Sequence, residues 1–125
     1  MKVMRWLVDG MNVIGTRPDG WWRDRSGAMH ALVDDLDAFA AGRPEDEVAV
    51  VLDGRPRDVG APTHVDVAFA AGGRDAADHE IARRAAADPD DLVVVTSDRE
   101  LAERVRAAGA RVEPSRGFRE RLDAS

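Results

Sequence analysis

The sequence contains no cysteine, a single lysine and no long hydrophobic run. The absence of cysteine excludes disulfides and thiolate metal sites. No apolar segment approaches the ~20 residues that a membrane-spanning helix needs. Residues 1–5 enter a strand pattern directly, without the hydrophobic region of a signal peptide. Together these absences predict a cytoplasmic protein without a membrane partner.

Motifs of several familiar protein classes are missing as well. No Gly-x-Gly-x-x-Gly follows the first strand pattern, which argues against a Rossmann dinucleotide domain. There is no Walker A sequence and no serine nucleophile elbow. A receiver-like signalling domain would also gather aspartates at strand ends, but it typically needs a lysine at the end of its last strand. The only lysine here is Lys2, so we discount that class.

The chain has 125 residues, of which 44% are hydrophobic and 34% are charged, and this predicts one folded domain over residues 1–125. Its formal net charge is −6, unlike that of the basic proteins that coat nucleic acids. Arginine supplies 17 of the 18 cations, and its planar guanidinium suits phosphate oxygens. Because two bound dications would offset four negative charges, the acidic balance does not exclude a nucleic-acid substrate.

Strand and helix patterns alternate along the chain. Strands are expected over residues 4–9, 47–52, 64–70, 92–96 and 111–113. Helices are expected over residues 27–41, 76–87 and 99–108, with a terminal helical turn over 115–122, while residues 10–25 have the composition of a loop. This order predicts an α/β fold, a three-layer α-β-α sandwich with about five mostly parallel strands.

Several details of this architecture follow from local signals. Ser26 is expected to cap the first helix, and Gly109 is a good residue to end the helix before it. The connection over residues 52–64 lacks a helical pattern, so the direction of the third strand stays open. The first and fourth strands are expected to be central neighbours, which would place Asp9 and Asp98 side by side.

Aspartates follow the hydrophobic runs of the predicted sheet. Asp9, Asp53 and Asp98 come at or just after strand ends, and a glycine loop leads from the third strand to Asp75 and Asp78. The carboxyl ends of parallel strands share one edge, where ligands bind. Clustered carboxylates repel one another, and a divalent cation is the usual compensation. The pattern therefore predicts a metal-dependent site for phosphate chemistry.

Each of these aspartates also has a purely structural interpretation. Asp75 could cap the second helix, with Asp78 in its first turn, and Asp98 could serve the next helix in the same way. Asp9 and Asp53 each precede a glycine, a common turn pair. The combination favours a site, because all five positions map to the same edge of one sheet.

Four segments resemble the motifs of one family. The stretch from Asp9 to Asn12 resembles the opening Asp-Gly-x-Asn of NYN domains in the PIN-like nuclease superfamily, and residues 51–54 resemble the end of their second strand. Residues 75–81 are similar to the Glu-x-Ala-Asp-x-x-Ile stretch of YacP-like members, with Asp75 in place of the glutamate. Residues 94–99 match their Thr-Ser-Asp segment. The resemblance spans about residues 4–113.

The resemblance implies a five-stranded PIN-like sheet and an Mg²⁺- or Mn²⁺-dependent endoribonuclease that acts on single-stranded RNA, free or ribosome-bound. By position, Asp9, Asp78 and Asp98 would be metal-binding and catalytic acids, and Asp75 a fourth metal ligand. Asn12 would assist catalysis by positioning Asp9, a water or a phosphate oxygen. The metal would lower the pKa of a bound water and offset charge in the transition state. Candidate substrate-binding residues are Asn12, Asp53, Arg55, Arg74, Ser97 and Arg99.

An alternative of a different class is a PIN-like RNA- or ribosome-binding module that has lost catalysis. The acids present at all matching positions speak against that loss. The sequence leaves open the RNA target, DNA against RNA, the number of metal ions and the oligomeric state.

Two adjacent tryptophans, Trp21 and Trp22, lie in the 10–25 loop among arginines. They could form a base-stacking platform beside phosphate-binding guanidinium groups. The competing interpretation is packing under the loop. We expect that packing for at least one of them, because adjacent side chains rarely face the same way.

Overall fold

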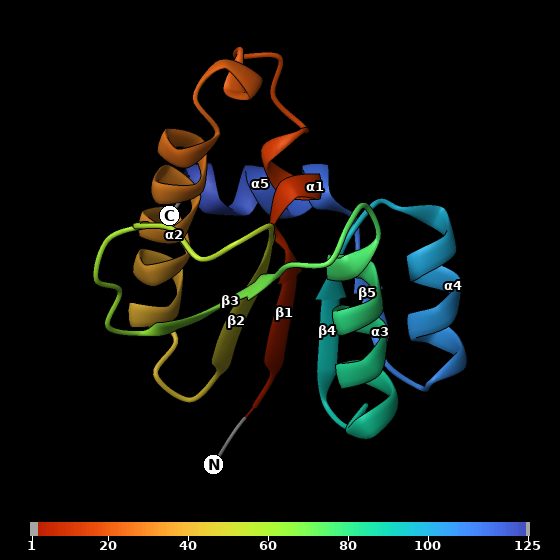
Figure 1. Cartoon of the computed structure of the whole chain (residues 1–125). Helices are drawn as coiled ribbons and strands as arrows, with labels where there is room; N and C mark the ends of the chain where they lie inside the picture. The colour runs from red at the N-terminus through yellow and green to blue at the C-terminus, as the bar shows by residue number, and fades with distance from the viewer. Residues whose placement is uncertain (1–2, 125) are drawn as a thin grey trace.

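A computed structural model describes residues 3–124, which form a five-stranded sheet between two layers of helices (Figure 1). The strand order is β3-β2-β1-β4-β5, and every neighbouring pair is parallel. The strands are β1 (Arg5–Asp9), β2 (Glu47–Asp53), β3 (Val65–Ala70), β4 (Leu92–Val95) and β5 (Arg111–Glu113). The helices are α1 (Gly10–Ile14), η1 (Trp21–Arg23), α2 (Arg25–Ala41), α3 (Ala76–Ala87), α4 (Arg99–Ala107) and α5 (Ser115–Ala124). The predicted α-β-α sandwich is confirmed.

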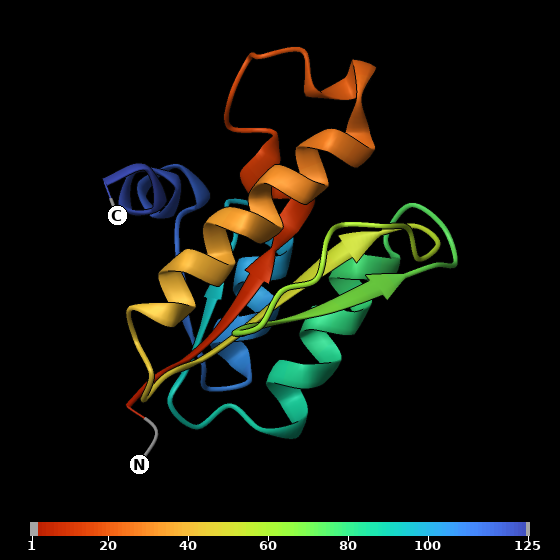
Figure 2. The same ribbon diagram turned by 90° about the vertical axis from the view of Figure 1, so that its left-hand side faces the viewer.

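The central strands are buried on both faces, as a parallel sheet covered by helices requires. In β1, Trp6 and Val8 face a core shared with α1, α2 and α5, whereas Leu7 faces a core shared with α3 and α4. Figure 2 shows the resulting layers from the side of α2. The carboxyl ends of the strands point toward the end of the molecule that carries α1 and η1.

Three aromatic rings hold α2 and α5 against the sheet. Trp6 meets Phe39 edge-on at a centroid distance of 5.5 Å, and Phe39 meets Phe118 at 5.3 Å. Phe118 is fully buried. The segment over residues 115–122, expected from the sequence to be a terminal turn, is part of a longer helix. This segment belongs to α5, a helix of ten residues, because Phe118 and Leu122 dock one turn apart on the same core.

The direction of the third strand, left open by the sequence, is parallel. The β2–β3 connection achieves this without a helix, because it is fastened to α2 instead. The Asp37 side chain accepts hydrogen bonds from the backbone N–H groups of Thr63, His64 and Val65 at 2.6–3.0 Å. Val59 in this connection is buried in the core on the α2 side of the sheet.

The 10–25 segment differs most from expectation, because it contains α1 and η1 rather than loop alone. The expected cap of the first helix was also wrong. α2 begins two residues earlier, and Asp24, not Ser26, accepts the capping hydrogen bond from Gly27 N. The Ser26 hydroxyl instead accepts a hydrogen bond from Arg57. Gly109 follows α4 with a φ of 100°, as expected for a helix-ending glycine.

In residues 3–124, none of the helices has the length and apolar character that crossing a membrane would demand.

Candidate active site

The first site residue is fixed by the tight packing of the β1–α1 junction. Asp9 ends β1 with only 5% of its surface exposed, and Gly10 opens α1. A Cβ atom on Gly10 would lie 2.5 Å from Leu52 Cδ2 and 3.0 Å from the Val51 carbonyl oxygen of β2. A larger residue would push the turn away from β2, so the glycine holds Asp9 at the buried edge of the sheet.

Thr96 joins the ends of the two central strands. Its hydroxyl donates to Asp9 Oδ2 at 2.8 Å and accepts from the backbone N–H of Asp98 at 3.1 Å. β1 pairs directly with β4, with Val8 opposite Val95. The expected adjacency of Asp9 and Asp98 therefore holds, and the 1%-exposed Thr96 is the bridge between them.

The start of α3 brings in two further carboxylates. Asp78 lies in the first turn and is partly buried, while Asp75 is exposed at the N-cap position. The starts of α3 and α4 enclose a cavity of about 120 Å³. Its lining contains Asp75, Asp78, His79, Asp98, Glu100, Leu101 and Arg104.

The carboxylates affect one another electrostatically. Burial raises the pKa of Asp9 to about 7 against the opposing effect of the Thr96 hydrogen bond, and the charges of Asp78, Asp53 and Asp98 raise it further. The pKa of Asp78 is also raised, by burial first and then by Asp98, Asp75 and Asp53. The five predicted acids thus form one interacting group, the acid cluster, although they come from four separate segments.

Asp53 is the member of the acid cluster at the end of β2. Burial raises its pKa, and the positive charge of Arg25 opposes that shift. Its Oδ1 atom is buried and has no hydrogen-bond partner among residues 3–124. A buried carboxylate oxygen without a donor is unfavourable unless something else binds it.

The purely structural interpretation holds for some of the aspartates and fails for others. Asp98 does cap α4, because its Oδ1 accepts a hydrogen bond from Leu101 N at 2.8 Å. Asp75 occupies the cap position of α3 but makes no capping hydrogen bond from its side chain. Helix capping therefore accounts for Asp98 and leaves the positions of Asp9 and Asp75 unexplained.

Asn12 fastens three segments behind the acid cluster. Its Oδ1 accepts hydrogen bonds from Ser97 N at 2.8 Å and from Ser115 Oγ at 2.5 Å. The Ser97 hydroxyl in turn accepts from Ser115 N at 2.9 Å. Asn12 thus ties α1 to the β4–α4 loop and to α5.

Sequence reasoning missed two residues of this site. Thr96 stood inside the recognised Thr-Ser-Asp segment, so a signal for it existed. Buried Ser115 gave none, because it meets Asn12 across 103 positions of sequence. The predicted substrate-binding arginines Arg55, Arg74 and Arg99 are exposed, and so is Ser97.

The donor set suits a hard cation, since every candidate ligand is an oxygen. The raised pKa values and the unpartnered Asp53 Oδ1 are the features that a bound cation would relieve. Within the described part of the chain, however, no three His, Cys, Asp or Glu side chains already stand as a group that could hold a metal ion. Metal binding would therefore require side-chain rotation.

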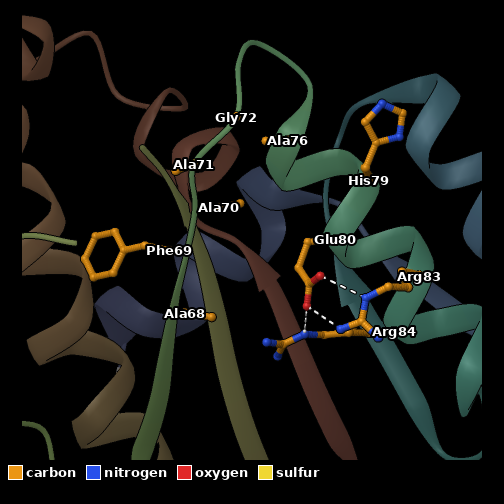
Figure 3. A pocket seen from close by; sticks show the side chains of 10 residues that line it. All are labelled: Ala68, Phe69, Ala70, Ala71, Gly72, Ala76, His79, Glu80, Arg83 and Arg84. Atoms are coloured by element: carbon orange, nitrogen blue, oxygen red, sulfur yellow. Dashed lines mark hydrogen bonds and ion pairs between the residues drawn. The ribbon is translucent and has the colours of Figure 1, made fainter. Parts of the chain in front are cut away.

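A larger cavity of about 570 Å³ lies on the other side of α3, against the end of β3 (Figure 3). Glu80 accepts hydrogen bonds there from Arg83 and Arg84, at 2.7 and 2.6 Å. None of the five acids lines this cavity, and His79 is the lining residue that it shares with the smaller one. We place the site at the smaller cavity, because three of the five acids, Asp75, Asp78 and Asp98, line that one.

Comparisons with known proteins agree with this arrangement. The family model for the YacP-like NYN domain matches residues 6–125. A crystal structure of Rae1 (YacP) from Bacillus subtilis has a TM-score of 0.71 and 22% identity, covering 99% of this chain and 75% of that one. A tryptophan-to-leucine mutant of the same protein has a TM-score of 0.75 and 24% identity, covering 97% and 76%. These structures share the fold. No protein with a curated description matches the sequence.

Proposed function

The chain belongs to the YacP-like NYN domain family, a PIN-like nuclease family, and from this premise we propose a metal-dependent endoribonuclease. Its substrate would be single-stranded RNA, cleaved at the acid cluster of Asp9, Asp53, Asp75, Asp78 and Asp98. We further predict a cytoplasmic enzyme, in keeping with the absence of cysteine. The RNA would be either free or ribosome-bound.

The observation that carries the proposal is the burial of Asp9, 5% exposed, near the carboxylates of Asp53, Asp78 and Asp98, and this setting raises the pKa of Asp9. A folded protein that buries one carboxylate among three others retains a destabilising arrangement unless a ligand relieves it. An Mg²⁺ or Mn²⁺ ion bound there would supply Lewis-acid stabilisation and a more acidic water.

The chain's own residues would position the reacting groups. The Thr96 hydroxyl donates to Asp9 Oδ2 and thereby fixes the orientation of that carboxylate. Asp98 is held by its capping hydrogen bond, so α4 orients it. Exposed Arg55, Arg74 and Arg99 would attract the RNA backbone, since guanidinium groups bind phosphate oxygens in pairs.

One observation favours the alternative, a non-catalytic PIN-like RNA- or ribosome-binding module. As noted, no preassembled group of three metal-binding side chains stands among residues 3–124. If side-chain rotation cannot assemble such a group, the domain would bind RNA without cleaving it.

Cleavage of end-labelled single-stranded RNA distinguishes the two functions. The wild-type protein should produce internal cuts with Mn²⁺ or Mg²⁺ and none with EDTA, and Asp9→Asn should produce none with either metal. Asparagine keeps an oxygen for the Thr96 hydroxyl, so the variant removes the charge and leaves the hydrogen bond. DNA of the same sequence serves as the second substrate. Binding of RNA without any metal-dependent cut would establish the non-catalytic alternative.

A further inference from the structure

The loop between α1 and α2 lies at the end of the molecule toward which the carboxyl ends of the strands point (Figure 1), and it contains an exposed tryptophan. Trp22 is 56% exposed, and Val3 is the one other large hydrophobic residue so exposed among residues 3–124. Trp21 behaves differently, because it packs against the core on the α2 side. The expectation that at least one of the pair packs under the loop therefore holds for Trp21.

Trp22 is held by its surroundings even though it is exposed. Its ring meets the Trp21 ring edge-on, with centroids 6.0 Å apart. Gly20 has a φ of 77°, which favours glycine, and its carbonyl oxygen accepts a hydrogen bond from Arg23 N at 2.9 Å. The Asp19 side chain accepts one from Trp21 N at 3.2 Å. An exposed ring on a fixed turn loses little side-chain freedom when it binds a flat ligand.

Cationic groups accompany the ring. The Arg23 guanidinium lies 5.9 Å from the Trp22 ring centroid, and that of Arg25 lies 5.9 Å from the Trp21 ring centroid. Burial raises the pKa of Asp53 and the charge of Arg25 opposes that rise, so this charge reaches the end of β2. Ring and cation contacts thus join Trp22 to Arg25, and the charge of Arg25 acts on Asp53 of the acid cluster.

We propose that Trp22 is a base-stacking residue, which holds an unpaired nucleobase of the RNA while Arg23 and Arg25 neutralise the adjoining phosphates. This inference rests on the proposed RNA substrate. An aromatic ring next to guanidinium groups matches a nucleotide, because the ring can stack on the flat base and the guanidinium groups can bind the anionic phosphate. An apolar peptide would match the ring but not the arginines. In a duplex the bases stack on one another and their faces are covered, so the platform selects single strands.

RNA binding measured by fluorescence anisotropy in EDTA tests the stacking without cleavage. Trp22→Ala should weaken binding of a short single-stranded RNA about tenfold, whereas Trp22→Phe should retain most of the affinity. Val3→Ala is the matched control, because it removes the other exposed large hydrophobic side chain and should leave the affinity unchanged. Melting temperatures of all variants should equal that of the wild type, since neither side chain lies in the core.

A series of RNAs with one abasic nucleotide at successive positions locates the stacked base. One abasic position should weaken binding to the wild-type protein by about the same factor as Trp22→Ala, and should have no further effect on that variant. Equal affinities of wild type and Trp22→Ala for every RNA would overturn the inference.

Cleavage with Mn²⁺ separates this inference from the proposed function. Metal-dependent cleavage that Trp22→Ala leaves unchanged in KM would remove the stacking role and leave the nuclease. Trp22-dependent binding without cleavage would remove the nuclease and leave the stacking role. A wild-type protein that neither binds nor cleaves single-stranded RNA would contradict both.

Discussion

Asp37 and Asp9 carry the same side chain in opposite environments. Asp37 accepts three backbone N–H groups where α2 meets the start of β3, and these hydrogen bonds, that of His64 first, lower its pKa. Asp9 is buried with one hydroxyl donor and three acidic neighbours, and its pKa is raised to about 7. The first carboxylate stabilises the fold, while the second leaves an unfavourable interaction that a ligand could relieve.

α3 repeats the contrast within one turn. Glu80 receives hydrogen bonds from Arg83 and Arg84, which lower its pKa to about 2. Asp78, two residues earlier, faces other carboxylates and has a raised pKa. The position of a carboxylate relative to the sheet edge, rather than its presence in a helix, therefore distinguishes structural acids from candidate catalytic ones.

The largest expected effect is on catalysis by the acid cluster. Asp78→Asn should reduce RNA cleavage on the order of a thousandfold, because it removes a charge that would bind metal without changing the volume of the side chain. The melting temperature of the metal-free protein should stay equal or rise, since repulsion with Asp98 and Asp75 is relieved. Glu80→Gln on the same helix is the control. An Asp78→Asn enzyme as active as the wild type would remove Asp78 from the site.

The next effect is on the pH dependence of stability. Because the pKa of Asp9 is about 7 in the folded protein and 3.8 in an unperturbed aspartate, the folded protein binds an extra proton between these pH values. The free energy of unfolding of the metal-free protein should therefore fall as pH rises from 4 to 7, by at most about 4 kcal/mol. It should then level off.

Urea denaturation at a series of pH values measures this, with Asp9→Asn as the comparison. The variant cannot ionise, so its stability should fall less over the same range. Identical pH profiles for the two proteins would show that Asp9 is not the carboxylate with the perturbed pKa.

A smaller effect is expected at Asp37, whose pKa is lowered where that of Asp9 is raised. Asp37→Ala should lower the free energy of unfolding by about 2 kcal/mol, because three N–H groups at the start of β3 lose their acceptor. Cleavage should be unchanged below the melting transition. Chemical denaturation measures the change in the free energy of unfolding, and the RNA assay measures cleavage. A loss of activity in the intact protein would contradict the division into structural and catalytic acids.

The smallest effect is expected at Glu80. Glu80→Gln should lower the free energy of unfolding by less than about 1 kcal/mol, because Arg83 is exposed, Arg84 is only partly buried and solvent screens both pairs. The loss of stability should become smaller at high salt, because salt screens the ion pairs. Thermal melts with and without added NaCl measure this. A salt-independent loss would point to packing rather than charge.

Most of the fold could be predicted from the sequence, because strands buried on both faces and amphipathic helices leave clear patterns. The range of α3 and that of β5 match the expectation residue by residue. The short α1 could not be recognised, since five residues are too few to show a helical period. Likewise the cap of α2 was misplaced at Ser26, because Asp24 and Ser26 are both good capping residues and only tertiary contacts decide between them.

The candidate site was predictable where it depended on topology. Parallel strands place their carboxyl ends at one edge, so Asp9 and Asp98 had to be close once β1 and β4 were neighbours. The partners of Asn12 were not predictable, because they come from loops brought together by α5. Sequence patterns report faces and ends of elements, but not which distant side chains share a hydrogen bond.

Calorimetric titration of the protein with Mn²⁺ tests the central claim most directly, namely that the acid cluster assembles around a hard cation. We expect saturable binding to the wild-type protein, with release of a proton near pH 7 as Asp9 ionises, and loss of that binding in Asp78→Asn. Equal Mn²⁺ binding by both proteins, or no binding by either at millimolar metal, would contradict the account.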